Sequence, residues 1–186
     1  MITIFENTPY RTDKNLIESY NSFMKLLPND GWALFRDADT LFLDSFYGDL
    51  IVEAISNNKD VDCFTCLTNR IGNPKQLFNE YNGDDIIKHR EVASSLRSKY
   101  GSICEDFTKP ILPYIMSGMC FILSKKAWEK IGGFKEYTPG YGKMLGVDNK
   151  LHIDLYENGF KTKIIKGLYV YHWYRGGKRN DIKHLL

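Results

Sequence analysis

The alternation of apolar segments with helical and strand-like spacing is the feature of this sequence that most constrains its fold. Residues 14–27 carry apolar side chains at helical spacing, and residues 32–36 form a short apolar run. Residues 46–56 again favour a helix, and residues 61–68 form a second apolar run. Strand–helix–strand alternation is typical of α/β domains. We therefore expect an α/β fold with a Rossmann-like, mostly parallel central sheet flanked by helices.

Length and charge limit the classes of protein that this chain can belong to. Its 186 residues suffice for one domain with a core, so we expect a single domain over residues 1–186. A net charge of +2 does not favour a nucleic-acid partner. No apolar run approaches the roughly 20 residues of a transmembrane segment, and the first residues do not resemble a signal peptide. We expect a cytoplasmic protein; the sequence leaves its oligomeric state open.

The cysteines do not predict a metal site. Cys63 and Cys66 form a Cys-x-x-Cys, but no second pair has this spacing. A zinc ribbon needs two such pairs. Both residues fall in the apolar run 61–68, so we interpret them as buried structural thiols.

Two aspartates, Asp37 and Asp39, stand where the run of residues 32–36 ends. In an extended segment, side chains two residues apart point the same way, so both carboxylates can converge on one hard cation. A second pair with this spacing, Asp60 and Asp62, begins a strand instead of ending one. Ligands of open α/β sheets bind outside the carboxyl ends of strands. We therefore expect Asp37 and Asp39 to bind a metal cation, and we interpret Asp60 and Asp62 as solvated loop carboxylates.

An aspartate pair after a strand also resembles the Asp-x-Asp-x-Thr motif of haloacid dehalogenase phosphatases. Here Thr40 comes one residue too early and Leu41 takes its place, which counts against phosphatase chemistry. No glycine-rich, basic loop at the first strand supports a nucleotidyltransferase. Both readings are less favoured alternatives.

Later segments add to the aspartate pair. They are Ser-Gly-Met-Cys-Phe at residues 117–121, Gly-Gly-Phe at residues 132–134, Asp148 at a helix start, and His172 in the last strand. In this order the set resembles the GT-A glycosyltransferases of the family 2 type and the related catalytic domains of polypeptide N-acetylgalactosaminyltransferases. The resemblance covers roughly residues 14–175. It implies a GT-A-like domain and a metal-dependent enzyme of the hexosyltransferase type.

The resemblance also implies a reaction and a metal site. A sugar would move from a nucleotide-diphosphate donor to a hydroxyl acceptor on a glycan or another molecule. Asp37, Asp39 and His172 would hold Mn²⁺, or alternatively Mg²⁺, with Asp39 the closer aspartate. An imidazole ligand fits Mn²⁺ better than Mg²⁺. From the residues alone, His172 is equally well a strand residue with satisfied ring nitrogens.

Asp148 is the candidate general base of an inverting displacement. Its place at a helix start favours the ionised form. A simple N-cap aspartate is the alternative, and the sequence does not settle whether the reaction inverts or retains. His152 lies one turn further on the same face and could orient the acceptor, although a surface histidine explains it equally well.

The remaining candidates are less specific. Few residues precede Asp37, so the nucleotide-binding half of the family is shortened here. Candidate donor contacts in that half are Asn7, Thr8, Arg11 and Asn21, and candidate diphosphate contacts near the end of the chain are Arg175 and Lys178. The glycine-rich residues 137–145 resemble a lid, and the residues expected to contact the acceptor or close over it are Tyr141, Gly142 and Trp173. The shortened half keeps a second function open, a sugar- or nucleotide-binding module of the same fold without catalysis.

Overall fold

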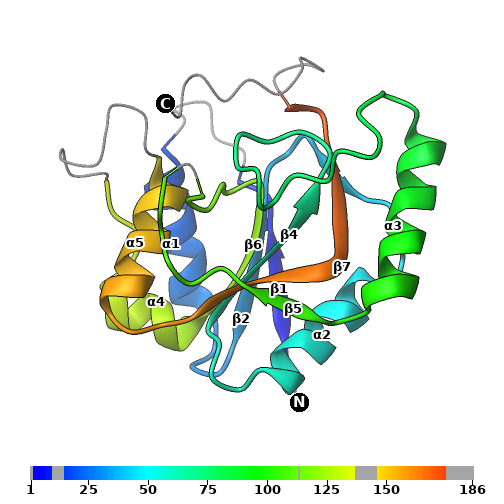
Figure 1. The fold of residues 1–186 in the computed structure, drawn as a ribbon. Helices are drawn as coiled ribbons and strands as arrows, with labels where there is room; N and C mark the ends of the chain where they lie inside the picture. The colour runs from blue at the N-terminus through cyan, green and yellow to red at the C-terminus, as the bar shows by residue number, and fades with distance from the viewer. Residues whose placement is uncertain (1, 10–14, 113, 137–145, 175–186) are drawn as a thin grey trace.

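The computed structural model describes residues 2–9, 15–112, 114–136 and 146–174. Within these residues the strands are β1 (Ile4–Asn7), β2 (Trp32–Arg36), β3 (Thr40–Phe42), β4 (Cys63–Thr68), β5 (Cys104–Asp106), β6 (Cys120–Ser124) and β7 (Thr162–His172). The helices are α1 (Leu16–Leu26), α2 (Tyr47–Asn57), α3 (Ile86–Tyr100), α4 (Lys125–Ile131) and α5 (Val147–Glu157). The chain is therefore an α/β domain, as the alternating pattern predicts (Figure 1).

The strands form one curled sheet of mixed direction. Its order is β1-β2-β6-β4-β7-β3, and β5 pairs with β7 beside this path. Only the β1–β2 and β4–β7 pairs are parallel, and the other four are antiparallel. The prediction of a mostly parallel sheet is therefore wrong. Strand β6 runs antiparallel to both of its neighbours, β2 and β4, and β7 runs antiparallel to β3 and β5, so the strand–helix–strand pattern of the sequence does not account for these pairs.

Strand β7 is long and bent. The sequence predicts two strands, over residues 161–166 and 168–173, whereas the structure has a single strand. Its register against β4 shifts between Cys66 and Leu67, which pair with Ile165 and Tyr169. A Cβ atom on Gly167 would lie 2.1 Å from the carbonyl oxygen of Gly101, so this close approach requires glycine. The bend lets the first part of β7 pair with β5 and its last residues pair with β3 (Figure 1).

Alternating side chains of the sheet build a hydrophobic core on each face. In β2, Ala33 and Phe35 belong to a core with α1, α4 and α5, whereas Leu34 belongs to a second core with α2. Figure 1 shows α1, α4 and α5 grouped together, with α2 and α3 on the other side of the ribbon, although Ala93 and Leu96 of α3 belong to the first core. This alternation is the two-residue period of a strand that is buried on both faces. Among the described residues, no helix is long and apolar enough to cross a membrane.

Local signals account for both ends of α4 and for the start of α1. The sequence predicts a short helix over residues 125–131 that stops at Gly132, and helix α4 has these bounds. The Ser124 hydroxyl accepts the Ala127 N–H, and Gly132 ends the helix with a positive φ of 77°. Helix α1 is capped by Asn15, whose side chain accepts the Glu18 N–H. The predicted cap, Asp13, lies outside the described residues. The thiols of Cys63 and Cys66 are buried and free, which confirms the prediction for both.

Candidate metal centre

Asp37, Asp39 and His172 lie together at the carboxyl ends of strands. Asp37 follows β2, and His172 ends β7, more than a hundred residues later. The Nε2 atom of His172 is 3.3 Å from Asp39 Oδ1 and 4.0 Å from Asp37 Oδ2. One ligand atom from each residue falls within 4.8 Å of the others. The predicted proximity of His172 to Asp39 is therefore confirmed.

A tight turn between β2 and β3 positions the aspartates. The Thr40 hydroxyl donates to the Asp37 carbonyl at 2.7 Å, and Arg36 Nη1 donates to the Thr40 carbonyl at 2.8 Å. Thr40 then pairs with His172 in the ladder between β3 and β7. The buried Thr40 side chain is thus part of the turn and does not line the cavity beside Asp37. Thr40 is therefore not placed to act as the threonine of the phosphatase motif would.

The hydrogen bonds of His172 fix its tautomer. Its Nδ1 atom lies 2.9 Å from the carbonyl oxygen of Arg70, which can only accept. Nδ1 therefore carries the proton, and Nε2 presents a lone pair toward the two carboxylates. Burial lowers the pKa of His172, so the ring is neutral near pH 7. A neutral imidazole whose other nitrogen donates to a carbonyl is the usual form of a metal-ligating histidine.

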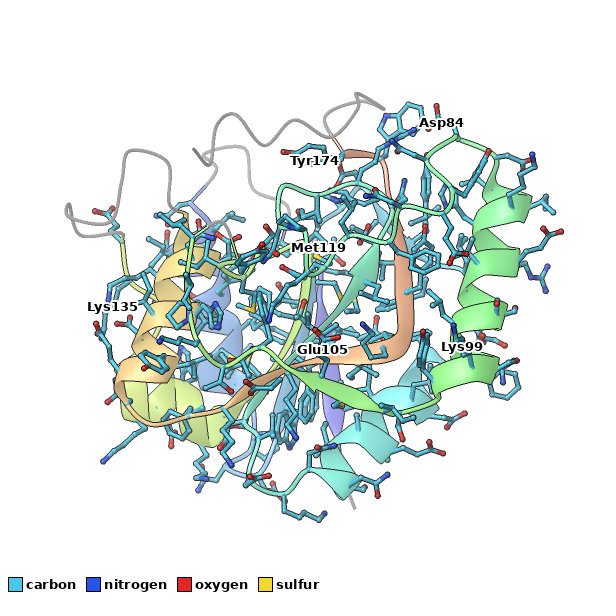
Figure 2. All side chains as sticks on the ribbon, viewed as in Figure 1. Asp84, Lys99, Glu105, Met119, Lys135 and Tyr174 are labelled. Atoms are coloured by element: carbon cyan, nitrogen blue, oxygen red, sulfur yellow. The ribbon has the colours of Figure 1, made fainter. Side chains whose placement is uncertain are left out.

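A cavity of about 430 Å³ adjoins these three residues and also contains Asp148. Met119 and Tyr174, which both line it, lie in the upper part of the ribbon in Figure 2. Burial first, and then the charges of Asp39 and Asp148, raise the pKa of Asp37 to about 7. Among its described lining residues the cavity has no lysine or arginine. A cation bound there would relieve this concentration of negative charge.

Asp148 is held in the first turn of α5. Its Oδ2 atom accepts the Gly118 N–H at 2.6 Å. Burial raises the pKa of Asp148, whereas hydrogen bonds from the main chain of Gly118 and Asn149 lower it. The N-cap of this helix is Gly146, whose N–H donates to Asn149 Oδ1 at 2.8 Å. Asp148 is therefore not the N-cap, and its carboxylate lines the cavity.

Two residues that sequence reasoning gave no role support this side of the cavity. A Cβ atom on Gly118 would lie 2.6 Å from the Asp148 Cβ, so only glycine permits this contact. Gln76 is fully buried and binds the main chain of Ser117 twice, accepting from its N–H at 2.8 Å and donating to its carbonyl at 3.1 Å. The Ser117-Gly118 pair in the sequence is the available signal for the glycine. No sequence pattern marks Gln76.

His152 does not contact the cavity, which corrects its assignment to the acceptor site. Its side chain is fully buried. Nε2 lies 2.7 Å from the Phe107 carbonyl, and Nδ1 accepts the Met116 N–H at 3.0 Å. Both ring nitrogens are therefore used by the main chain, and burial lowers the pKa of His152 to about 4. The surface alternative is wrong for the same reason.

None of the N-terminal donor candidates that the structure describes lines the cavity. Asn21 binds the main chain of Phe134 through both atoms of its amide and accepts from the Trp128 indole, so its role is structural. Asn7 ends β1, next to β2, and its buried Oδ1 atom has no hydrogen-bond partner among the residues that the structure describes. Neither Asn7 nor Thr8 lines the cavity.

The last group of candidates lies near or beyond the end of β7. The Trp173 side chain is 42% exposed and does not line the cavity, although its N–H donates to the Asp39 carbonyl at 2.9 Å. Tyr174, which the sequence did not single out, does line it and packs edge-on against the His172 ring. The candidates outside the described residues are Arg11, Tyr141, Gly142, Arg175 and Lys178.

The second aspartate pair has structural partners. Asp62 accepts the Ser124 hydroxyl at 2.8 Å and lies 3.5 Å from the Lys126 ammonium. Asp60 is exposed and forms an ion pair with Lys161. The interpretation as a solvated loop carboxylate fits Asp60, which is exposed, and is wrong for Asp62, which is buried.

Comparison with known proteins adds no family to these observations. No protein-family model matches the chain, and no match was found among curated proteins.

Proposed function

We propose that this protein is a metal-dependent glycosyltransferase with a GT-A-like domain, which moves a sugar from a nucleotide-diphosphate donor to a hydroxyl acceptor. The observation that carries the proposal is the convergence of Asp37, Asp39 and His172 on the cavity that Asp148 also lines. The resemblance to GT-A glycosyltransferases assigns the metal and the candidate base to these same four residues. Asp37 and Asp39 lie in the turn after β2, Asp148 lies in α5, and His172 ends β7, so the four residues come from segments that are far apart in the sequence.

The donor set supports a divalent cation. Two carboxylates and one neutral imidazole suit Mn²⁺, and Mg²⁺ less well. Asp37, Asp39 and His172 would hold the ion. When bound, it would supply Lewis-acid stabilisation of the negative charge on the departing diphosphate.

Asp148 would accept the proton of the acceptor hydroxyl. Its carboxylate faces the cavity, and one oxygen is held by the Gly118 N–H at 2.6 Å. This hydrogen bond fixes the orientation of the carboxylate. The other oxygen, Oδ1, is therefore held in one position and would be the atom that accepts the proton. Burial keeps its pKa above the ordinary value, which increases its basicity. The acceptor oxygen would attack the sugar carbon from the face opposite the diphosphate, the bond to the diphosphate would break, and the hydroxyl proton would pass to Asp148. A single displacement of this kind inverts the sugar carbon.

Donor hydrolysis tests this proposal directly. Purified protein is incubated with a panel of nucleotide-diphosphate sugars with and without Mn²⁺, and release of the nucleoside diphosphate is measured. We expect Mn²⁺-dependent release from at least one donor. The Asp148→Asn variant should keep donor and Mn²⁺ binding while turnover falls by about 10²-fold or more, the usual contribution of a general base.

Asp154→Asn is the matched control, because Asp154 lies on the same helix, is buried, and pairs with Lys150 away from the cavity. Metal-dependent donor binding without any turnover would favour the non-catalytic binding module. Near-normal turnover of Asp148→Asn would exclude this residue as the base. Phosphate release from simple monoesters would favour a phosphatase instead.

A further inference from the structure

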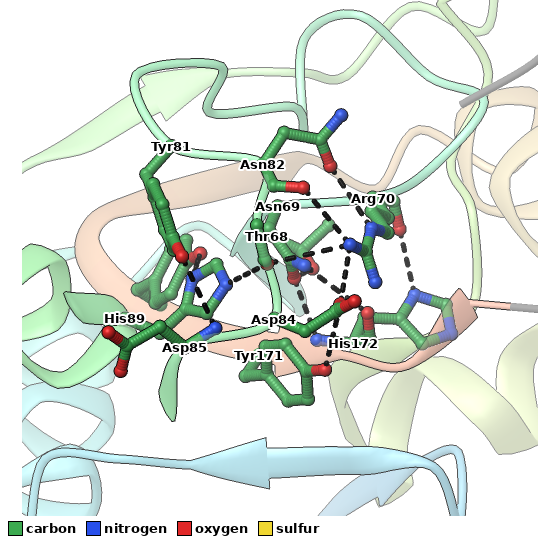
Figure 3. A network of polar contacts seen from close by, with 12 residues as sticks. Thr68, Asn69, Arg70, Tyr81, Asn82, Asp84, Asp85, His89, Tyr171 and His172 are labelled. Atoms are coloured by element: carbon green, nitrogen blue, oxygen red, sulfur yellow. Dashed lines mark hydrogen bonds and ion pairs between the residues drawn. The ribbon is translucent and has the colours of Figure 1, made fainter. Parts of the chain in front are cut away.

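We propose that Asn69 is a positioning residue, which holds the main chain of His172 and so sets the affinity of the site for its cation. The inference rests on the proposed metal site. It adds a residue that has no contact with the cation and that no sequence motif indicates. Figure 3 shows Asn69, Arg70 and His172 in one network of polar contacts.

The Asn69 side chain continues the sheet where its main-chain pairing stops. Thr68 pairs with Val170 in the parallel ladder of β4 and β7, and Asn69 follows directly. Its Oδ1 atom accepts the His172 N–H at 2.8 Å, and its Nδ2 atom donates to the His172 carbonyl at 3.3 Å. Because both main-chain groups of His172 are bound by one buried amide, the end of β7 has little freedom to move relative to β4.

The orientation of the amide is also determined. Oδ1 accepts the Thr68 hydroxyl at 3.3 Å in addition to the His172 N–H. Two donors on one side and a carbonyl on the other leave only one way to place the oxygen and the nitrogen. Asn69 is fully buried, so water cannot replace these contacts without a rearrangement.

The next residue fixes the imidazole ring. The Arg70 carbonyl accepts the proton of His172 Nδ1, which directs Nε2 toward Asp37 and Asp39. The Arg70 side chain is itself anchored, with Nε donating to Asn82 Oδ1 at 3.0 Å and Nη2 lying 2.5 Å from Asp84 Oδ1 (Figure 3). Asn69 therefore sets the main chain of His172, and Arg70 sets its ring, from adjacent positions.

Mn²⁺ affinity is the first test. Asn69→Ser removes both contacts with His172, and free Mn²⁺ is measured by electron paramagnetic resonance during titration. We expect 10- to 100-fold weaker binding, as is usual when a residue that orients a metal ligand is lost. Asn73→Ser is the control, because Asn73 is equally buried in the same loop but binds the Ile115 carbonyl and the Lys75 N–H. It should lose stability to a similar degree and keep its Mn²⁺ affinity.

A second measurement needs no metal. In ¹⁵N-labelled, metal-free protein at pH 7.5, the ring nitrogen shifts of His172 report its tautomer. Wild type and Asn73→Ser should show the Nδ1–H form. In Asn69→Ser the released main chain of His172 no longer holds Nδ1 against the Arg70 carbonyl, so a mixture of both tautomers should appear. Should Asn69→Ser not fold, both measurements are made on Asn69→Gln, which keeps the amide but displaces it by one methylene.

The two measurements separate the inference from the proposed function. If wild type binds no Mn²⁺ while the tautomer changes as expected, the metal-dependent function fails and the positioning role stands. If wild type binds Mn²⁺, and the Asn69 variant matches it in both affinity and tautomer, the positioning role is overturned. An equal loss of affinity in both variants would also overturn it, because general destabilisation would then explain the effect.

Discussion

The Asp39 carboxylate and the His172 ring face each other at 3.3 Å, and burial keeps the ring neutral. A neutral imidazole gains little from the nearby carboxylate charge, so this contact by itself stabilises the fold weakly. A divalent cation would convert the same geometry into two strong bonds. The contact is therefore better suited to holding an ion than to stabilising the free protein.

The Asp39→Asn substitution tests this reading at the residue scale. It removes a negative ligand but keeps the size of the side chain, so we expect Mn²⁺ affinity to fall by about 100-fold, with little change in melting temperature. Isothermal titration calorimetry measures the affinity. Asp62→Asn, in the second Asp-x-Asp pair, should bind Mn²⁺ like wild type. Equal affinities of wild type and Asp39→Asn would contradict the metal assignment.

Gly118 makes a second prediction possible. An alanine methyl group would overlap Asp148, whose Cβ would be 2.6 Å away, so the carboxylate must shift. Overpacking of this kind costs about 1–3 kcal/mol in the free energy of unfolding. We expect Gly118→Ala to lose that amount in urea denaturation and to lower donor turnover at least as much as donor binding. Unchanged stability and turnover would show that the site accommodates the methyl group.

The sequence alone indicated the ionisable residues of the candidate metal site. It did not indicate the neutral amide side chains that support the site through hydrogen bonds. Asp37, Asp39 and His172 stand out because carboxylates and imidazoles at strand ends are few and have a known chemistry. Asn69 and Gln76 act through main-chain groups of segments more than 40 residues away. Such pairings depend on which segments the fold brings together, and neither residue type nor spacing reports that.

At the scale of elements, the sequence predicts the parts of the fold that local signals determine, and fails where a strand pairs with a segment far away in the sequence. Helix α4 is predicted with its bounds because Ser124 and Gly132 signal its ends locally. Strands β3 and β5 have three residues each and were not predicted, because their partner is the distant β7. The prediction of a mostly parallel sheet failed for the same reason, since β6 is antiparallel to β2 and β4. Pairing over long sequence separations, and not local propensity, determines these parts of the sheet.

The bend of β7 carries the third prediction. Gly167 approaches the Gly101 carbonyl too closely for a side chain, and the contact is with main chain, which cannot move aside as a flexible side chain could. We expect Gly167→Ala to destabilise the protein by about 3 kcal/mol, at the upper end of overpacking costs. Thermal or urea denaturation measures it. Gly48→Ala in α2, where an added Cβ meets nothing within 4 Å, should be neutral or slightly stabilising.

At the scale of the whole molecule, side-chain amides bind main-chain groups of segments that are far apart in the sequence. Asn69 binds His172, Gln76 binds Ser117, Asn149 binds Met116, and Asn21 binds Phe134, each through main-chain atoms. Main-chain groups in buried loops need partners, and these side chains supply them. The cavity is therefore surrounded by segments whose positions are fixed from several elements at once.

His152 performs the same function with a titratable ring, which makes the stability of the molecule depend on pH. It joins α5 to the main chain of Phe107 and Met116, and burial lowers its pKa to about 4. In the unfolded chain its pKa is about 6.5. Between these values the unfolded state binds a proton that the folded state does not. Stability should therefore fall as pH decreases from about 6.5 toward 4, and be unaffected by this group above pH 7.

Urea denaturation between pH 7.5 and pH 4.5 tests this dependence. His152 alone should lower the free energy of unfolding by on the order of 2–3 kcal/mol over the range, since each pH unit below 6.5 contributes up to about 1.4 kcal/mol. In His152→Gln, the amide can donate to the Phe107 carbonyl and accept the Met116 N–H without titrating. This variant should be less stable than wild type at pH 7.5, and the difference should shrink or reverse at pH 4.5. Parallel curves for the two proteins would mean that His152 is protonated in the folded state, contrary to its buried contacts with the main chain.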